Sequence, residues 1–133
     1  MKKFLLDTNI CVYFLNGKYN LEQKIETIGF NNCAVSEITI AELKYGVAKS
    51  KQIEKDQKFL TTFQSLITFI PIFPALDIYA TEKARLKTKG KILDDFDLLI
   101  GSTAIFNQLV LVTKNISDFD RLSEIQIEDW TGE

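Results

Sequence analysis

Short apolar runs alternate with amphipathic stretches along the whole chain. The runs fit buried strands, and they lie at residues 4–6, 33–36, 68–72, 109–112 and 125–127. Between most of them, apolar residues recur every three or four positions, which is the helical period. The helices that this spacing predicts span residues 10–15, 21–28, 38–48, 52–67, 74–89 and 97–107. Because strands alternate with helices, we expect one α/β domain over residues 1–133, with a mostly parallel sheet of four to five strands covered on both faces.

Carboxylates follow two of the predicted strands. Asp7 comes directly after the first apolar run. Asp118 follows the run at 109–112 after a loop of five residues, and Asp120 lies two residues further on as an alternative. In open α/β sheets, ligands bind outside the carboxyl ends of the strands. The fold therefore places Asp7 where chemistry is expected, whereas Asp118 and Asp120 also fit the start of a helical turn.

Two further acids lie on predicted helices. Glu42 lies beside an apolar stripe, so we expect it to project toward the protein, although a solvated Glu without a role fits the same pattern. Asp97 is expected as the first residue of the most apolar helix, where a carboxylate can simply cap the helix. Gly101, one turn later, is expected to keep that helix face open. Asp94 and Asp95 add charges that a bound cation would compensate, and both also fit loop or cap positions.

Composition narrows the possible chemistry. The chain contains no histidine, which excludes zinc-hydrolase, Ser-His-Asp and Cys-His mechanisms. A formal net charge of −2 argues against a polycation that coats nucleic acid, but it is compatible with a local basic patch. Cys11 and Cys33 lie among apolar neighbours and are expected as buried thiols. No run is long enough for a signal-peptide core or a membrane span, so we expect a cytoplasmic protein.

The four acids suggest a metal site with oxygen ligands only. Its expected members are Asp7, Glu42, Asp97 and Asp118. Oxygen ligands suit Mg²⁺ or Mn²⁺. Several carboxylates in one crevice cannot all stay ionised without a cation. With one or two divalent ions, such a cluster can activate water and stabilise the oxygens in the displacement at a phosphodiester. The residues by themselves favour a metal-dependent hydrolase that acts on phosphoryl groups.

Four segments of the chain resemble the PIN-domain family in order and spacing. They are Leu6–Asn9, Ile38–Gly46, Asp95–Gly101 and Val112–Phe119. More narrowly, they are similar to the VapC-type toxins of prokaryotic toxin–antitoxin pairs. Each segment alone is a weak signal, whereas four in register over essentially the whole chain are a strong one. The resemblance implies a three-layer α/β/α fold and a Mg²⁺- or Mn²⁺-dependent endoribonuclease whose RNA substrate belongs to the tRNA or rRNA class.

The resemblance also implies roles for individual residues. Asp7, Glu42 and Asp97 match the three core acidic positions of the family, and Asp118 matches a fourth, more variable position. The polar positions around these acids are matched by Thr8, Ser36, Thr113 and Asn115. For a toxin of this type, the resemblance further implies a homodimer and a cognate antitoxin whose tail occupies a groove near the active site.

Basic residues offer contacts to an RNA backbone. The candidates are Arg85, Lys87, Lys91 and Lys114. Lysine and arginine neutralise phosphates and position a nucleic acid, although the first three also fit a solvated helix end. Lys114 stands where the family more often has Arg, which replaces a planar fork by a point charge. Gly101 stands where the family commonly has Ala, and we expect that departure to be harmless for chemistry.

Other functions fit parts of the pattern less well. A haloacid-dehalogenase-like phosphatase needs a second Asp where the chain has Asn9. A receiver domain needs a phosphoacceptor Asp in the run at 33–36, which has none. A catalytically silent binding module is the remaining alternative, and intact acids at all four positions weigh against it.

Overall fold

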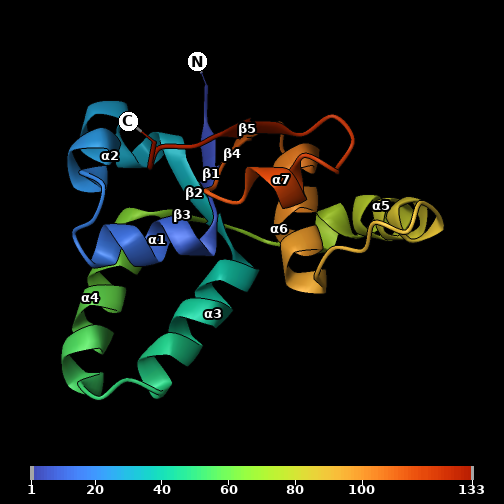
Figure 1. Cartoon of the computed structure of the whole chain (residues 1–133). Coiled ribbons are helices and arrows are strands. Elements are labelled where there is room, and N and C mark those ends of the chain that lie inside the picture. Colours follow the sequence, from blue (N-terminus) through green and yellow to red (C-terminus); the bar gives the residue numbers. More distant parts are fainter. Residues whose placement is uncertain (1, 133) are drawn as a thin grey trace.

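Five parallel strands form the centre of the molecule, which we describe from a computed structural model for residues 2–132 (Figure 1). The strands are β1 (Phe4–Leu6), β2 (Cys33–Ser36), β3 (Thr68–Ile70), β4 (Val110–Val112) and β5 (Gln126–Glu128). Their order across the sheet is β3-β2-β1-β4-β5, and each neighbouring pair is parallel. The chain therefore starts in the middle strand, builds one side of the sheet, and then crosses over to build the other side.

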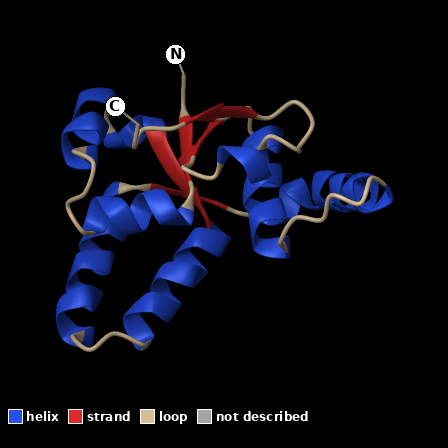
Figure 2. Ribbon diagram, in the orientation of Figure 1, coloured by secondary structure: helices blue, strands red, loops and turns tan. Residues whose placement is uncertain are grey.

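Helices connect the strands and cover both faces of the sheet (Figure 2). They are α1 (Thr8–Leu15), α2 (Leu21–Ile28), α3 (Glu37–Ala48), α4 (Ile53–Leu66), α5 (Leu76–Thr88), α6 (Asp95–Phe106) and α7 (Ile116–Phe119), with 3₁₀ turns η1 (Phe30–Asn32) and η2 (Phe73–Ala75). Successive side chains of a strand point to opposite faces. Phe4 and Leu6 accordingly pack in a core with α1 to α4, whereas Leu5 packs in a second core with α5 to α7. The expected three-layer α/β/α fold is confirmed.

The predicted strands and helices are present, with ends that shift by a few residues. The strand expected at 68–72 ends at Ile70 and lies at the edge of the sheet. Pro71 follows it, at a place where a residue without an N–H interrupts no ladder of hydrogen bonds. The helix expected from residue 74 begins as the 3₁₀ turn η2, and the last strand lies one residue later than expected. These shifts leave the order of the elements unchanged.

The start of α6 and the surroundings of Gly101 differ from the expectation. The helix begins two residues early because the Asp94 carboxylate accepts a hydrogen bond from the backbone N–H of Phe96 at 3.1 Å and caps it. The prediction that Asp97 is the first helical residue is therefore wrong, since it lies within the first turn. Gly101 does not leave an open face either. A Cβ added there would overlap with Cδ1 of Leu122, which fills the space beside the glycine.

Two expectations from composition can also be compared with the structure. Cys11 and Cys33 are buried free thiols, as predicted. Within residues 2–132, no helix combines the length and the apolar character that crossing a membrane requires.

Candidate active site

The carboxyl ends of β1 and β4 meet where the strand order reverses. On one side of β1 the sheet continues with β2 and β3, and on the other with β4 and β5. A reversal of this kind opens a crevice beside the strand ends, and ligands of open α/β sheets bind there. Asp7 follows β1, and its N–H donates to the Val112 carbonyl of β4 at 2.9 Å. Thr113 follows β4, so the first polar side chains after the two strands lie next to each other.

Two hydrogen bonds orient the Asp7 carboxylate. Its Oδ1 accepts from the Thr8 N–H at 2.8 Å and caps α1, and its Oδ2 accepts from Thr113 Oγ1 at 2.8 Å. Asp7 is only 4% exposed. Burial raises the pKa of Asp7 above its ordinary value, against the two hydrogen bonds, and the nearby charge of Glu42 raises it further. The carboxylate is held in a fixed orientation at a place that lacks positive charge.

Helix α3 brings Glu42 to the same crevice. Thr8 Oγ1 donates to Glu42 Oε1 at 2.6 Å and lies 3.0 Å from Thr39 Oγ1. Ser36, the last residue of β2, caps α3 by accepting from the Ile38 N–H at 3.0 Å. The cap fixes where the helix begins, and the helix then carries Glu42 to the site about one and a half turns later. Thr8 therefore joins the two helices whose acids enter the crevice.

Asp97 projects into the same region from the first turn of α6. Its pKa is raised to about 6, first by burial and then by nearby charges. Those charges belong to Asp7, Asp94, Glu42 and Asp118. Carboxylates influence one another in this way only at short range, because the interaction falls off with distance and with screening by water. Acids from separate segments of the chain are therefore gathered around Asp97.

Asp118 lies in the short helix α7 and is oriented by its neighbours. Asn115 Nδ2 donates to its Oδ2 at 2.8 Å, and Arg121 Nη2 lies 3.4 Å from its Oδ1. Asn115 is placed in turn by Thr113, whose Oγ1 accepts from the Asn115 N–H at 3.0 Å. Asp120 lines a separate groove with Arg121. The charge of Asp118 contributes to the raised pKa of Asp97, so Asp118 is the one of the two acids that faces the cluster.

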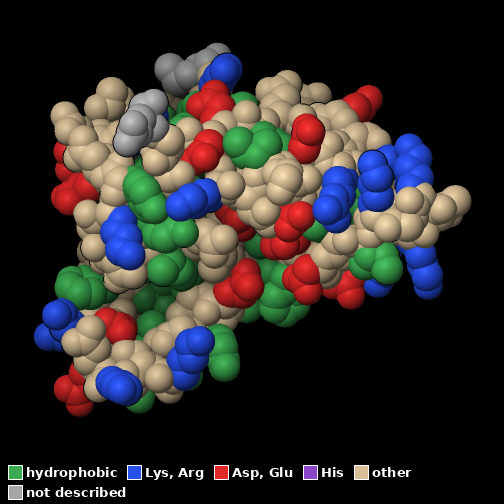
Figure 3. Space-filling model, in the orientation of Figure 1, with side chains coloured by type: hydrophobic (Ala, Val, Ile, Leu, Met, Phe, Trp, Pro, Cys, Tyr) green, Lys and Arg blue, Asp and Glu red, His purple; other side chains and the backbone are tan. Residues whose placement is uncertain are grey.

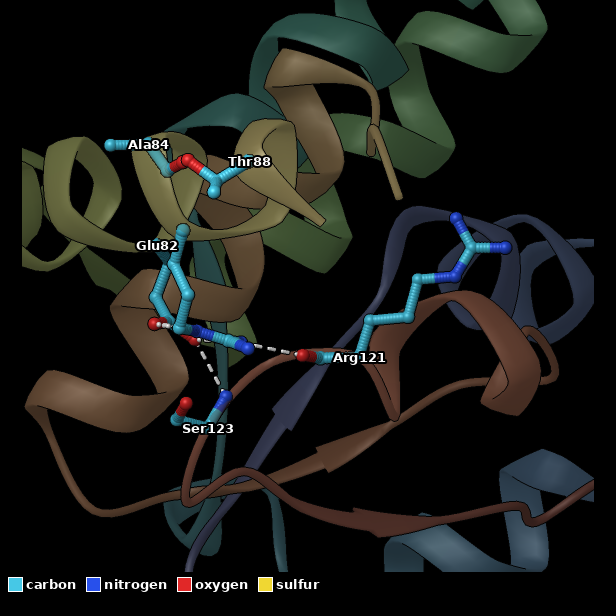
Figure 4. A network of polar contacts seen from close by, with 6 residues as sticks. Glu82, Ala84, Thr88, Arg121 and Ser123 are labelled. Carbon is cyan, nitrogen blue, oxygen red and sulfur yellow. Dashed lines mark hydrogen bonds and ion pairs between the residues drawn. The ribbon is translucent and has the colours of Figure 1, made fainter. Parts of the chain in front are cut away.

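The basic residues named from the sequence lie in three different settings. Arg85 forms a forked ion pair with the buried Glu82, with both nitrogen–oxygen distances at 2.9 Å, and also donates to the Arg121 carbonyl at 2.7 Å (Figure 4). Lys87 and Lys91 are exposed. Lys114 is exposed as well, and its Nζ donates to a tyrosine hydroxyl at 3.0 Å. The Arg85 guanidinium bonds to groups of the protein itself, and it thereby holds α5 to the loop after α7.

Two contributors to the site could not be singled out from the sequence. Thr39 shares the Thr8 hydroxyl with Glu42 and lies three positions before it on α3, and that helical spacing was the available signal. Glu82 also accepts from the Ser123 N–H at 2.6 Å. Through Arg85 it fixes the loop beside Asp118, and a Glu three positions before an Arg was its only sequence signal. Helical ion pairs of this kind are common on solvated surfaces, so the spacing alone did not indicate a buried role.

The oxygen atoms in the crevice are suitable ligands for a divalent cation. All are carboxylates or hydroxyls, which suit Mg²⁺ and Mn²⁺. The pKa of Asp97 is raised first by burial and then by the charges of neighbouring acids, and a cation would offset both effects. Within the described part of the chain, no three acidic or thiol groups stand close enough to ligate one ion in their present conformations. Glu42 and Asp7 are instead hydrogen-bonded to threonine hydroxyls, which would have to share those oxygens with a metal.

Charges are separated over the surface that carries the site. Acidic side chains gather in the middle of the face shown in Figure 3, near the start of α3 and of α6. Lysine and arginine side chains lie around them, over α5 on one side and over the far ends of α3 and α4 on the other. A surface of this pattern leaves an anionic ligand few places to approach except along the basic margins.

A parallel α/β sheet in this strand order, with acids at its switch point, has the features of a PIN-type domain. The PIN domain model matches residues 4–125, so the chain belongs to the PIN-domain family. Curated relatives cover almost its full length. It is 41% identical to ribonuclease VapC2 of Rickettsia felis, over 96% of this chain and 97% of that protein. It is 30% identical to the tRNA(fMet)-specific endonuclease VapC of Shigella flexneri, over 98% and 100%.

Solved structures also place the chain among PIN-domain proteins of the VapC type. VapBC of Salmonella typhimurium bound to DNA superposes with a TM-score of 0.90 at 30% identity, covering 98% of this chain and 99% of that chain. VapBC2 of Rickettsia felis bound to a promoter DNA fragment gives 0.84 at 37% identity, covering 96% and 98%. Within the PIN family, the chain therefore belongs to the VapC-type toxins. Since the curated relatives are ribonucleases by name, the nuclease interpretation is supported over a silent binding module.

Proposed function

We propose that this protein is a divalent-metal-dependent endoribonuclease and the toxin of a toxin–antitoxin pair. The observation that carries the proposal is the cluster around Asp97, where acids from β1, α3, α6 and α7 meet at the switch point of a PIN-domain sheet. Its catalytic and metal-binding residues are Asp7, Glu42, Asp97 and Asp118. Those that support them are Thr8, Ser36, Thr113 and Asn115. A cation held there, Mg²⁺ or Mn²⁺, makes a water molecule more acidic and stabilises charge that develops on the phosphate.

The residues of the chain position the reacting groups. Hydrolysis adds the elements of water across one P–O bond and leaves a phosphomonoester and a hydroxyl group. Asp7 is held in one orientation by hydrogen bonds from the Thr8 N–H and the Thr113 hydroxyl. In the metal-free protein the pKa of Asp97 is raised to about 6, and a bound cation would lower it again, so that Asp97 would be an ionised ligand. Lys87, Lys91 and Lys114 are exposed and free to contact phosphates on either side of the cleaved bond.

An RNA of the tRNA or rRNA class is the proposed substrate. The Shigella flexneri relative is named for tRNA(fMet), and this chain covers all of it, which supports a structured RNA as the target. A cytoplasmic location is part of the same proposal, because such RNAs are there. The two free buried thiols are compatible with that reducing compartment.

A cognate antitoxin is the proposed protein partner. A toxin–antitoxin complex from Klebsiella pneumoniae is among the solved structures that this chain resembles, at 26% identity with a TM-score of 0.69. A groove of about 390 Å³ lies between α1 and the α3–α4 pair, and Glu42 is one of its lining residues. Its apolar lining includes Val12, Leu43, Val47 and Phe59. Figure 3 shows this hollow beside the acidic centre, so a tail seated in it would reach the active site.

A homodimer is also proposed. Phe73 is 79% exposed, Leu76 37% and Phe96 47%, on elements η2, α5 and α6 that pack on one another. Exposed apolar side chains that gather in this way are typical of association surfaces. Sedimentation analysis should give twice the chain mass of 15.2 kDa. A mass of one chain at micromolar concentration would exclude the dimer.

The central test is RNA cleavage under metal control. Purified protein is incubated with a panel of tRNAs and rRNA fragments in Mg²⁺, in EDTA, and as the Asp7→Asn variant. We expect cleavage by the wild type in Mg²⁺, and we expect both EDTA and the Asp7→Asn substitution to abolish it. Asp77→Asn is the matched control, because Asp77 is an exposed acid in the first turn of α5 and lies outside the cluster. Equal cleavage in all three conditions would show that the acids and the metal are not responsible.

A further inference from the structure

An exposed aromatic side chain lies beside the site on a strained loop. The loop joins α1 and α2 and contains Tyr19 and Asn20, whose φ angles are 58° and 57°. Residues with a Cβ seldom adopt this left-handed conformation, and each costs about 1–2 kcal/mol. Two in succession hold the Tyr19 ring at the surface, 44% exposed. Strain of this kind persists where surrounding contacts hold the backbone, and it often accompanies function.

Those contacts come from Tyr13 and Lys114. The Tyr13 and Tyr19 rings meet edge to face, with centroids 5.0 Å apart and planes at 76°. Lys114 Nζ donates to Tyr19 Oη at 3.0 Å and lies 5.1 Å from the Tyr19 centroid and 5.6 Å from that of Tyr13. Tyr13, Tyr19 and Lys114 therefore form one rigid unit, the aromatic–lysine cluster, on the surface of the protein.

This cluster is connected to the active site through the backbone. Lys114 directly follows Thr113, whose hydroxyl holds Asp7, and directly precedes Asn115, which holds Asp118. The backbone of Lys114 therefore lies between two residues that hold the acids, and its side chain extends to the two tyrosines. In the described part of the protein, no carboxylate lies within ion-pair distance of Lys114, so its ammonium keeps hydrogen-bond donors for a ligand.

We propose that the aromatic–lysine cluster is a nucleobase subsite, in which the Tyr19 ring stacks on a base flanking the cleaved phosphate and Lys114 contacts the adjoining phosphate. The inference rests on the proposed ribonuclease function. An aromatic platform beside a cation is the combination that single-stranded nucleic acids recognise. A platform fixed before binding loses little conformational entropy when a base stacks on it. Since every base has a π face, the subsite adds affinity at one position of the strand and selects bases only weakly.

The test combines a protein change with a substrate change. Short RNAs that the wild type cleaves are prepared with an abasic nucleotide at successive positions around the cleavage site. At the stacked position, the abasic RNA should raise the KM of the wild type about 5- to 150-fold, the range for loss of one stacked base. Tyr19→Ala should raise the KM for intact RNA by the same factor and should not respond to the abasic nucleotide there. The kcat should stay unchanged in both cases.

Two further variants separate stacking from folding. Tyr19→Phe keeps the ring and loses the hydroxyl, so it should retain most of the affinity. Tyr45→Ala is the matched control, because Tyr45 is 66% exposed on α3 and has its own lysine, Lys49, 4.9 Å from the ring centroid. It should cleave like the wild type. An unchanged KM for Tyr19→Ala would overturn the proposal. So would a raised KM for Tyr19→Ala that rises further with the abasic nucleotide at every position.

Failure of the nuclease itself is a separate outcome. If the wild type cleaves no RNA, the proposed function fails, and binding of fluorescent single-stranded RNA to the Asp7→Asn protein then tests the subsite alone. Weaker RNA binding after Tyr19→Ala would still support it. If Tyr19→Ala instead lowers affinity for a co-expressed protein inhibitor and leaves RNA binding unchanged, the cluster is a protein contact and the proposal is wrong.

Discussion

Replacing Asp97 by Asn should stabilise the metal-free protein while it removes activity. The pKa of Asp97 rises on folding from 3.8 to about 6, because the side chain is buried among other acids. Two pKa units correspond to about 3 kcal/mol, which partial exposure to solvent reduces to about 1–3 kcal/mol. Losing an acid from the first turn of α6 costs about 0.3–1 kcal/mol. The cost of holding the charge in a partly buried site among other acids is the larger effect, so the free energy of unfolding should increase by about 1–2 kcal/mol at neutral pH.

The stability difference between the wild type and Asp97→Asn should also depend on pH. A carboxyl whose pKa is raised by folding destabilises the folded state when it is ionised. The penalty is complete above the folded pKa of about 6, fades as the pH falls through it, and is gone below 3.8, the ordinary value for the unfolded chain. Between about pH 7.5 and pH 5, the wild type should therefore gain stability relative to Asp97→Asn, and the difference between them should shrink.

Urea denaturation in EDTA at several pH values measures both effects. Asp77→Asn is the control, because it removes an acid from the first turn of another helix without touching the cluster. Excess Mg²⁺ should reverse the order, since a ligand that binds only the folded wild type stabilises it by mass action. The reasoning is refuted if Asp97→Asn is less stable than the wild type in EDTA, or if the difference between them does not change with pH.

Three further changes test other parts of the structure. Thr113→Val removes the hydrogen bond to Asp7 and should weaken Mn²⁺ binding about 10- to 100-fold in calorimetry; equal affinity would contradict the orienting role. Glu82→Gln weakens the forked pair with Arg85 and should lower the Tm by about 5 °C at pH 7. Because the pKa of Glu82 is lowered in the folded protein, mainly by Arg85, the wild type should lose this advantage as the pH falls below the ordinary value of 4.5, and a constant difference would argue against it. Gly101→Ala should lower the free energy of unfolding, measured by urea titration, by up to about 2 kcal/mol, because overlap with Leu122 outweighs a gain in helix propensity of about 1 kcal/mol. A clear stabilisation would show that Leu122 moves away freely.

The fold was predictable because local signals agreed with the global arrangement. The apolar run at β4 and the polar residues after it could only be a buried strand ending at a site. The position of Asp7 followed from the same rule, since the carboxyl ends of parallel strands share one edge. The strand expected over residues 68–72 ends earlier, at Ile70, directly before Pro71, which has no N–H to donate.

What could not be predicted depends on contacts between distant segments. No pattern along α6 indicates that Leu122, two elements later, fills the space beside Gly101. The commitment of Arg85 to Glu82 depends on a loop 36 residues away, so the sequence showed only a basic helix end. Tyr19 carries no signal of its own, because an exposed tyrosine in a loop is unremarkable until Lys114 is seen against it.

The strand order also has a consequence for synthesis on the ribosome. The hydrogen bond from Thr113 to Asp7 joins residues 106 positions apart, and the middle strand is the first to be made. At about 5–20 residues per second, roughly 5–20 s pass between the emergence of these two residues. Until then β1 lacks its neighbour β4, and the acid cluster lacks Asp118, which is made five residues after Thr113. A nascent chain therefore cannot assemble the acid cluster until residue 118 has been made, and an antitoxin made alongside it has that interval in which to fold.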